Sequence, residues 1–172
     1  MASVKPFGPN RLVMGLLLSR RALLSEVLAE LERLYGPIEC ASTIRSFTES
    51  DYYDREMGGQ PLRLWVAFTN LVDPSQLSVI KGQTNALEQR YLNDEGGREV
   101  NLDPGLLSLT SLVLATAKGR AHRIALFDGI WADLTLIWSK GGFAALEWTY
   151  RDYRDEAVRD LFTQWREDLK QY

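Results

Sequence analysis

The spacing of hydrophobic and polar positions changes its period several times along the chain, and each change marks a predicted element. The nearly unbroken apolar run 11–19 is typical of a central strand that is covered on at least one face. Apolar side chains recur every three or four positions across 20–35, which predicts an amphipathic helix ended by a glycine-proline pair. Alternation with a period of two then predicts strands at 38–47 and 62–68.

A second helix is expected to begin at Asp73, a residue type that caps helix N-termini well, with Pro74 in the first helical position. A fourth strand is predicted at 98–102, and the apolar stretch 106–118 indicates a third helix stopped by a glycine. Between these two elements, Asp103 and the proline after it repeat the cap pairing of the second helix. The favoured interpretation of Asp103 is therefore a helix cap.

The C-terminal third of the sequence predicts a β-meander and a final helix. The pair Asp128-Gly129 is a strong hairpin signal, and a second turn is expected at 140–142. The expected strands are 122–127, 130–138 and 144–150, and the expected helix is 157–169.

This order of elements predicts a single α+β domain over residues 1–172. Its first six elements match the β-α-β-β-α-β order of a ferredoxin-like core. We expect a mostly antiparallel sheet that is extended by the C-terminal meander and helix. A doubly wound parallel sheet is the alternative, and the two late hairpin turns argue against it.

Composition narrows the classes of function. The formal net charge of −3 argues against general binding to nucleic acid or to anionic membranes, because such binding draws on clustered lysine and arginine. The single cysteine, Cys40, excludes an internal disulfide and a cysteine-based zinc site. The first ten residues lack the pattern of a signal peptide, and the run 12–18 is too short to span a bilayer. A cytoplasmic protein is the expected result.

The junction after the fourth strand gathers polar side chains that could carry chemistry. Glu99, Asn101 and Asp103 fall on one side of the strand, and asparagine is a poor strand former. If Asp103 is more than a cap, it could act as a base or a cation ligand. A capping carboxylate would repel a phosphate at that helix end, so a cation or a hydroxyl- or amine-bearing ligand fits better there.

His122 is the only histidine, and imidazole is the natural proton carrier near neutral pH. The favoured interpretation of His122 is nevertheless a hydrogen-bonded structural residue, and a proton carrier is the alternative. In a regular strand Arg123 would point to the opposite face, where it could pair with Asp133 or Glu147.

The second helix carries Lys81, Asn85 and Glu88 on one stripe beside its apolar face. This position suits the lining of a cleft, with Lys81 as an anion contact and Glu88 as a base. An ordinary surface network is the equally supported alternative. In the connection 48–59, Tyr53 and Glu56 could belong to a lid over a ligand or pack on the sheet edge. Trp148 and Tyr150 fall on a face that the pattern predicts to be buried.

Several motifs stand in an order that points to a known family. They are Asn101-Leu102-Asp103-Pro104-Gly105, Asp51-Tyr52-Tyr53 with Glu56-Met57-Gly58, Lys81 with Thr84-Asn85 and Glu88, His122-Arg123, and Trp148-Thr149-Tyr150 with Asp152-Tyr153-Arg154. In these residues the chain resembles a bacterial domain-of-unknown-function family marked by the Asn-Leu-Asp-Pro-Gly motif, whose members are often labelled "GTP-binding protein". The resemblance implies little about activity.

The residues themselves give that GTP label little support. The family has Thr-Lys-Asp near the end of the expected third helix, whereas this chain has Thr116-Ala117-Lys118-Gly119 and lacks the carboxylate that would read guanine. The sequence also has no G-x-x-x-x-G-K-[ST] loop to hold phosphates.

Three hypotheses follow from these observations. The first is a small-ligand-binding domain or enzyme, with Asp103, His122 and Glu88 as catalytic groups. Its ligand-binding residues would be Asn101, Lys81, Asn85, Glu56, Tyr53, Arg123 and Lys118. The second is a non-catalytic protein-interaction module in which the same residues are caps and surface networks. The third is GTP binding. The sequence indicates no metal site and identifies no cofactor, and it leaves the oligomeric state open.

Overall fold

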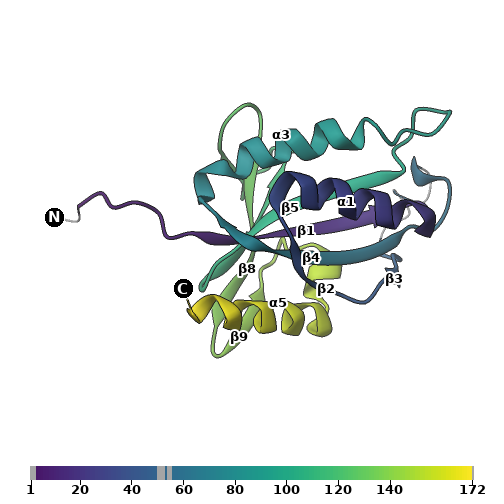
Figure 1. Ribbon diagram of the computed structural model, residues 1–172. Helices are drawn as coiled ribbons and strands as arrows, with labels where there is room; N and C mark the ends of the chain where they lie inside the picture. The colour runs from purple at the N-terminus through teal and green to yellow at the C-terminus, as the bar shows by residue number, and fades with distance from the viewer. Residues whose placement is uncertain (1–2, 50–52, 54–55, 172) are drawn as a thin grey trace.

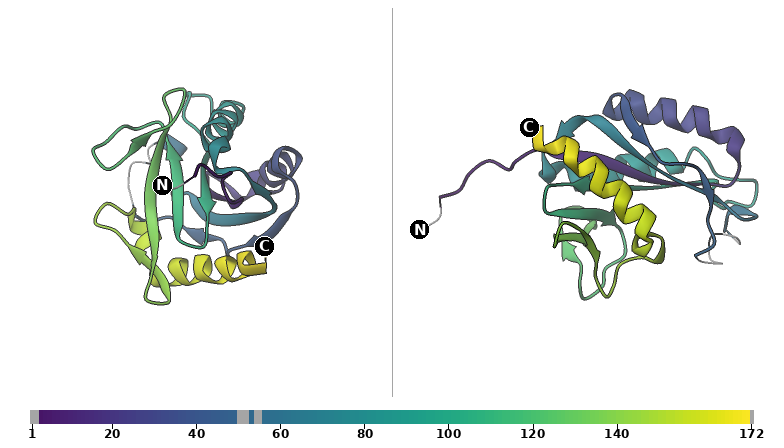
Figure 2. Two further views of the ribbon diagram at one scale, coloured as in Figure 1. Left: turned by 90° about the vertical axis from the view of Figure 1, so that its left-hand side faces the viewer. Right: turned by 90° about the horizontal axis from the view of Figure 1, so that it is seen from below.

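A computed structural model describes residues 3–49, 53 and 56–171. It has an α+β fold, in which one mostly antiparallel sheet carries helices on both of its faces. Helices α1 (Leu24–Tyr35) and α3 (Leu77–Glu88) lie on one face, and α5 (Glu156–Asp168) lies on the other (Figure 1). Figure 2 shows α5 lying across the strands of its own face. The α+β class predicted from the sequence is confirmed.

Within the described residues the sheet has nine strands, and β2-β4-β1-β5-β6-β8-β7 is the order of its main path. Strand β3 pairs with β4, and β9 pairs with β8. The pairings between these strands are all antiparallel. The strands are β1 (Asn10–Leu18), β2 (Ile38–Ala41), β3 (Arg45–Ser46), β4 (Leu62–Val72), β5 (Val100–Leu107), β6 (Ser111–Thr116), β7 (Ile124–Ala125), β8 (Trp131–Ser139) and β9 (Gly142–Ala145).

Strand β1 is central, as its continuous apolar run predicts. It lies between β4 and β5, and its residues are buried from Arg11 to Leu18. Leu12, Met14, Leu16 and Leu18 face α1 and α3 and form the larger apolar core with side chains of both helices. A strand that is buried on both faces must be apolar at successive positions, which accounts for the loss of alternation in this segment.

The second core lies under α5. Val13 of β1 and Trp65 of β4 pack there with Phe162 and Trp165 of the helix, and Tyr153 closes the cluster. Tyr153 belongs to the short helix α4 (Arg151–Arg154), which leads into α5. The Asp155 side chain accepts a hydrogen bond from the Ala157 backbone and so caps α5.

The predicted start of the second helix is confirmed. The Asp73 carboxylate accepts a hydrogen bond from the Ser75 backbone N–H, and Pro74 opens a 3-10 turn that continues into α3. The two hairpin turns are also confirmed. Asp128 and Gly129 both have positive φ between β7 and β8, and Lys140 and Gly141 do so between β8 and β9. Positive φ at both central residues is the geometry that tight hairpin turns require.

The third helix predicted at 106–118 is wrong. Strand β5 continues to Leu107, the chain turns, and β6 returns from Ser111 to Thr116. The Ser108 hydroxyl accepts hydrogen bonds from the backbone N–H groups of Thr110 and Ser111, which fixes the turn. A short apolar run fits a buried strand as well as a helix, and here the pairing of β6 with both β5 and β8 decides. Asp103 is consequently a strand residue and caps no helix.

The strands predicted at 38–47, 122–127 and 144–150 are divided or end early in the structure. The segment 38–47 forms two short strands, and only Ile124 and Ala125 of 122–127 are in a strand. The strand predicted at 144–150 ends at Ala145, so Trp148 and Tyr150 lie beyond it. These two rings are not in the core, because 39% and 40% of their surfaces are exposed.

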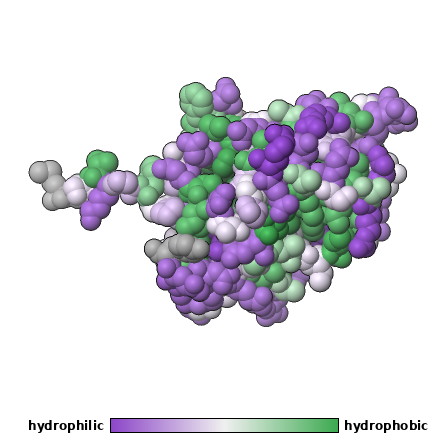
Figure 3. Space-filling model, viewed as in Figure 1, coloured by the Kyte–Doolittle hydropathy of each residue, from purple (hydrophilic) through white to green (hydrophobic). Residues whose placement is uncertain are grey.

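Hydrophilic side chains cover much of the face seen in Figure 3, with apolar side chains between them. Residues 3–9 form no helix or strand and extend away from the rest of the molecule (Figure 1). Within the described part of the chain, no helix is long and apolar enough to cross a membrane.

Candidate functional site

The sheet forks between β5 and β6. Strand β5 pairs with β1 from Val100 to Leu107, but it pairs with β6 only from Gly105 onwards. A Cβ atom on Gly105 would lie 2.6 Å from a methyl group of Leu114 and 3.1 Å from the Val113 carbonyl oxygen, so glycine permits the close approach of the two strands. Before Gly105 the strands separate, and one edge of β5 is left without a neighbouring strand.

Pro104 and two side chains of α3 complete this open edge. The Leu102 N–H donates to Glu88 Oε1 at 2.7 Å, and the Leu102 carbonyl accepts from Lys81 Nζ at 2.7 Å. Residues two apart in a strand direct their backbone groups to the same side, so the missing N–H of Pro104 also falls on the open edge. The Asn-Leu-Asp-Pro-Gly segment therefore builds the fork, and α3 takes the place of a missing strand.

A cavity of about 530 Å³ lies at the fork. It is lined by residues from β1, β4, β5, β6 and α3, from the loop after β6 and from the segment 148–153. The polar and aromatic lining residues are Phe47, Tyr53, Arg63, Lys81, Asn85, Arg98, Asn101, Asp103, Thr116, Lys118, Arg120, His122, Arg123, Trp148, Tyr150, Asp152 and Tyr153.

Arg63 is the buried cation of this cavity. Its side chain is 3% exposed, and its Nη2 atom lies 2.7 Å from a carboxylate oxygen of Asp152. Its Nη1 atom lies 3.5 Å from Asp103 Oδ2. The guanidinium group reaches Asp103 over Gly15, where a Cβ atom would lie 3.2 Å from both Nη atoms. The aromatic rings of Trp65 and Tyr153 flank the guanidinium, with centroids 4.7 and 5.5 Å from its central carbon.

Several donors at this point lack acceptors. The Nε and Nη1 atoms of Arg63 and the Tyr153 hydroxyl are buried and donate no hydrogen bond to any residue that the structure describes, although Nη1 keeps its 3.5 Å ion-pair contact with Asp103. Burial raises the pKa of the Tyr153 hydroxyl despite the Arg63 charge, so the hydroxyl keeps its proton and remains a donor. Buried donors without partners are rare in folded proteins, and a water molecule or a ligand could supply the missing acceptor here.

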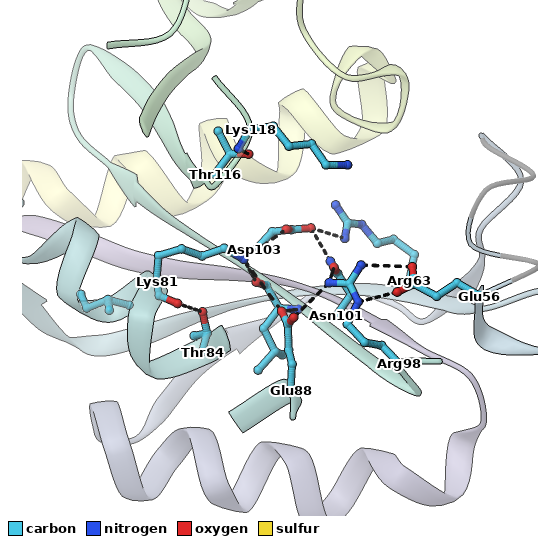
Figure 4. Close-up of polar contacts among 12 residues, drawn as sticks. Glu56, Arg63, Lys81, Thr84, Glu88, Arg98, Asn101, Asp103, Thr116 and Lys118 are labelled. Carbon is cyan, nitrogen blue, oxygen red and sulfur yellow. Dashed lines mark hydrogen bonds and ion pairs between the residues drawn. The ribbon is translucent and has the colours of Figure 1, made fainter. Parts of the chain in front are cut away.

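A second ion cluster supports the strand that carries Asp103 (Figure 4). Arg98 donates to both carboxylate oxygens of Glu56, at 2.6 and 3.1 Å, and to Glu88 Oε2 at 3.0 Å. It also donates to Asn101 Oδ1, and the Asn101 amide in turn donates to Asp103 Oδ2 at 2.9 Å. Burial raises the pKa of Glu88, against the opposing charge of Lys81. This chain of contacts fixes the orientation of Asp103.

His122 and Arg123 meet at one carboxylate. Asp133 is fully buried, and its Oδ2 atom lies 3.2 Å from His122 Nε2 and 2.8 Å from Arg123 Nε. The pairing of Arg123 with Asp133 is confirmed, whereas the opposite orientation expected for His122 is wrong, because this part of the chain is not a regular strand. Arg123 also donates to the Tyr150 hydroxyl and to the Lys118 carbonyl.

Trp148 and Tyr150 line the cavity next to His122 and Arg123, and we call these two rings the aromatic wall. The rings of His122 and Trp148 stack with centroids 5.0 Å apart and planes 16° from parallel. On another side of the cavity, Tyr53 makes an edge-on contact with Phe47. Burial, with the Asp103 charge as a smaller cause, raises the pKa of Tyr53.

Comparison with known proteins identifies the family but gives no activity. The model of the family described as "Domain of unknown function (DUF4416)" matches residues 8–169. The chain belongs to this family. No curated protein and no solved structure matches the chain.

Most residues predicted for the site come together in the DUF4416 chain. Asp103 and Lys81 line one cavity, and Lys81 Nζ lies 3.9 Å from Asp103 Oδ1. The other predicted residues that line it are Asn101, Asn85, Tyr53, His122, Arg123 and Lys118. Glu88 and Glu56 are not among the lining residues, because both are turned toward Arg98. The catalytic and binding roles assigned to these residues stay predictions.

The sequence pattern did not reveal Arg63, Asp152 and Tyr153 as parts of the site. Arg63 has a signal that could have found it: it shares a face with Trp65 and Ala67 in a strand whose other face is apolar as well. A charge in such a strand must be buried and paired. Residues 50–52, 54 and 55 of the connection 48–59, where a lid is one of the two predictions, lie outside the described residues.

The described lining is rich in positive charge and offers no metal cluster. It contains six arginine and lysine side chains and two carboxylates, Asp103 and Asp152. Among the described residues, histidine, cysteine, aspartate and glutamate side chains form no group of three or more that could hold a metal ion. The arrangement favours a ligand that brings hydrogen-bond acceptors.

Proposed function

We propose that this protein binds a small anionic molecule in the cavity at the β5–β6 fork. The observation that carries the proposal is the buried Arg63 guanidinium, whose Nε atom has no hydrogen-bond acceptor among the described residues and whose Nη1 atom makes only a 3.5 Å ion-pair contact with Asp103. A phosphate or carboxylate group supplies acceptors that match a guanidinium group. Binding such a group would satisfy donors that are already desolvated and held in place.

The surroundings of Arg63 support an anionic ligand. Lys118 extends from the end of β6 toward the space above Asp103 and Arg63 (Figure 4). Arg120 and Arg123 also line the cavity. The lining therefore attracts anions although the whole chain has a net charge of −3.

The position of Asp103 changes the ligand chemistry expected from the sequence. The sequence predicts that Asp103 caps a helix, where its carboxylate would repel a phosphate. In the structure Asp103 lies in strand β5 and caps no helix. Its carboxylate is paired with Arg63 and held by Asn101, so it leaves the cation-rich part of the cavity able to take an anion. Asp103 can accept a hydrogen bond from a hydroxyl or amine group on the same ligand.

Ligand-induced stabilisation tests this proposal directly. The melting temperature of the protein would be measured with inorganic phosphate, sulfate, acetate, a panel of anionic metabolites, GTP and ATP. We expect stabilisation by anions and none by matched neutral compounds, because only the folded chain presents the site. Stabilisation by GTP but not ATP would support the guanine-nucleotide alternative. No stabilisation by any compound would overturn the proposal and favour a protein-interaction module.

Lys118 offers the cleaner variant for this test, because Arg63 is buried and its removal also affects folding. Lys118→Ala should weaken binding of a stabilising anion roughly tenfold or more, as expected for loss of a charge-assisted hydrogen bond. Lys5→Ala removes the same charge from the exposed N-terminal segment and should leave affinity unchanged. Equal affinities in the two variants would contradict the assigned position of the ligand.

The contact between His122 and Asp133 favours a second candidate function, acid–base catalysis on the bound ligand. A carboxylate that accepts the Nε2 proton of an imidazole leaves Nδ1 free to take a proton from a substrate. Turnover of any ligand found in the screen should then fall at least about a hundredfold in His122→Gln with binding retained. Unchanged turnover would leave His122 a structural residue.

We also infer that β1, α1, β2, β4, α3 and β5 form a ferredoxin-like core. The strand order β2-β4-β1-β5 and the antiparallel pairing of these strands support this assignment. A solved structure that aligns with this core in the same order would test it.

A further inference from the structure

Two aromatic rings line the cavity and remain partly open to solvent. Trp148 and Tyr150 are 39% and 40% exposed, and both belong to the segment that follows β9. Folding proteins usually bury rings of this size, because aromatic surface contributes strongly to the hydrophobic effect. Two such rings on the wall of one cavity form a surface on which an apolar group of a ligand could pack.

The segment that carries these rings is held rigidly. Thr149 is 2% exposed; its hydroxyl accepts from the Leu146 N–H at 2.7 Å and donates to the Thr135 carbonyl at 2.6 Å. The Trp148 indole N–H donates to the Leu134 carbonyl at 2.9 Å. The Tyr150 hydroxyl accepts from Arg123. A surface that is fixed before binding loses little conformational entropy when a ligand packs on it.

The stack with His122 sets the orientation of the Trp148 ring. The planes of the two rings are 16° from parallel, so one face of each ring is covered by the other ring. His122 is itself held by the buried Asp133 carboxylate. A flat group of a ligand can pack against the aromatic surface that remains, in the offset or edge-on arrangements that aromatic pairs prefer.

The Trp148 and Tyr150 rings line the same cavity as the Arg63 guanidinium. Asp152, the ion-pair partner of Arg63, lies two residues after Tyr150. The Cα atoms of Tyr150 and Asp152 are therefore at most about 7 Å apart. One short segment therefore contributes both the aromatic wall and the carboxylate that holds Arg63. A ligand with a ring and an anionic group would find both kinds of lining in one cavity.

We propose that the ligand of this cavity is an aryl anion, a compound in which a planar aromatic ring carries a phosphate or carboxylate group. This proposal rests on the proposed function, because it adds a ring subsite to the anion site. The anionic group lies at Arg63, and the ring packs on the surface formed by Trp148 and Tyr150.

Matched pairs of ligands separate the two proposals. Calorimetry would compare phenyl phosphate with inorganic phosphate, and benzoate with acetate. We expect the aryl member of at least one pair to bind about tenfold or more tightly, as base stacking on aromatic side chains provides. In Trp148→Leu this advantage should disappear while the simple anion binds as before. Phe127→Leu removes a ring that is 73% exposed and outside the cavity lining, and it should leave the advantage intact.

His122 gives an independent readout, because the only histidine of the chain produces a single set of ring proton signals. Phenyl phosphate or benzoate should shift these signals by its ring current, beyond the shift that phosphate or acetate causes. Binding of the simple anions with no aryl advantage in either pair would overturn the ring subsite and leave the anion site standing. An advantage that survives in Trp148→Leu would also overturn the ring subsite alone. No binding by any of the four compounds would overturn both proposals.

Discussion

The two faces of the central sheet are buried in different ways. On the face under α1 and α3, β1 contributes four side chains, Leu12, Met14, Leu16 and Leu18, to the larger apolar core. On the opposite face, next to the β5–β6 fork, the same strand leaves room at Gly15 for the Arg63 guanidinium and the Tyr153 hydroxyl. One strand therefore supports an apolar core on one side and buried charges on the other.

The two faces differ in how much they contribute to stability. The apolar face stabilises the fold, whereas the buried charges of the cavity face contribute less to it. Apolar burial contributes roughly 25 cal/mol per Å² and needs no partner of a particular geometry. A buried ion pair loses much of its Coulomb attraction to desolvation, so it is weak evidence for stability. The cavity face keeps charges whose donors are only partly satisfied, which is the arrangement that the proposed anion site requires.

Breaking the buried ion pair should have the largest effect. Asp152→Ala leaves Arg63 without its 2.7 Å partner, and we expect the free energy of unfolding to fall by about 3–5 kcal/mol in urea titrations. Asp160→Ala removes an exposed carboxylate of α5 and should change it by less than about 0.5 kcal/mol. A double variant, Arg63→Met with Asp152→Leu, should recover most of the loss. Failure to recover would show that the charges themselves stabilise the fold.

Two neighbouring leucines of β1 sharpen the comparison, because they point to opposite faces. Leu16 is fully buried under the helices, and we expect Leu16→Ala to lower the free energy of unfolding by about 3–5 kcal/mol. Leu17 lines the cavity, where a new void joins existing space that water can enter, so Leu17→Ala should be less costly, at about 2–3 kcal/mol. Chemical denaturation of both variants measures the difference, and the reverse order would contradict the contrast between the faces.

The apolar face was predictable from the sequence, and the fork was not. Periodicity alone placed β1 and α1, because burial under a helix demands apolar side chains at set intervals. The pair Asp103-Pro104 predicts a helix start but lies in strand β5. A residue without an N–H suits two places equally: the first turn of a helix and the open edge of a strand. Only the approach of Leu114 to Gly105 distinguishes them, and that contact depends on how the chain returns in space.

The candidate site shows the same limit. The stripe of Lys81 and Asn85 and the junction at Asp103 were found because local spacing puts polar groups on one face. Arg63 and Tyr153 come from β4 and α4, and no local pattern relates them to β5. The cavity forms where separate strands and a helix fail to meet, so its lining follows from topology.

Two glycines test the fork with a smaller effect. Gly105→Ala forces a Cβ atom to within 2.6 Å of Leu114, and such overpacking should lower the free energy of unfolding by about 1–3 kcal/mol. Gly82→Ala is the matched control in α3, where nothing lies within 4 Å and the helix gains about 0.5–1 kcal/mol from alanine. The two changes should therefore shift the urea midpoint in opposite directions. A neutral Gly105→Ala would show that β5 and β6 can separate further without cost.

Opposite pH dependences at two glutamates should be the smallest effect. Burial raises the pKa of Glu88, whereas a hydrogen bond from Arg20 lowers the pKa of the partly exposed Glu99. A raised folded-state pKa gives a contribution that is present below the unfolded-state pKa and is lost as the pH rises through the folded-state value. A lowered one gives a contribution that is present above the unfolded-state pKa and is lost as the pH falls. As the pH rises from about 4 to 7, the free energy of unfolding of Glu88→Gln should therefore increase relative to that of the unsubstituted protein. The free energy of unfolding of Glu99→Gln should decrease relative to it over the same range. Urea titrations at several pH values measure both slopes, and slopes of the same sign would show that Glu88 is ionised as readily in the fold as a glutamate at the surface.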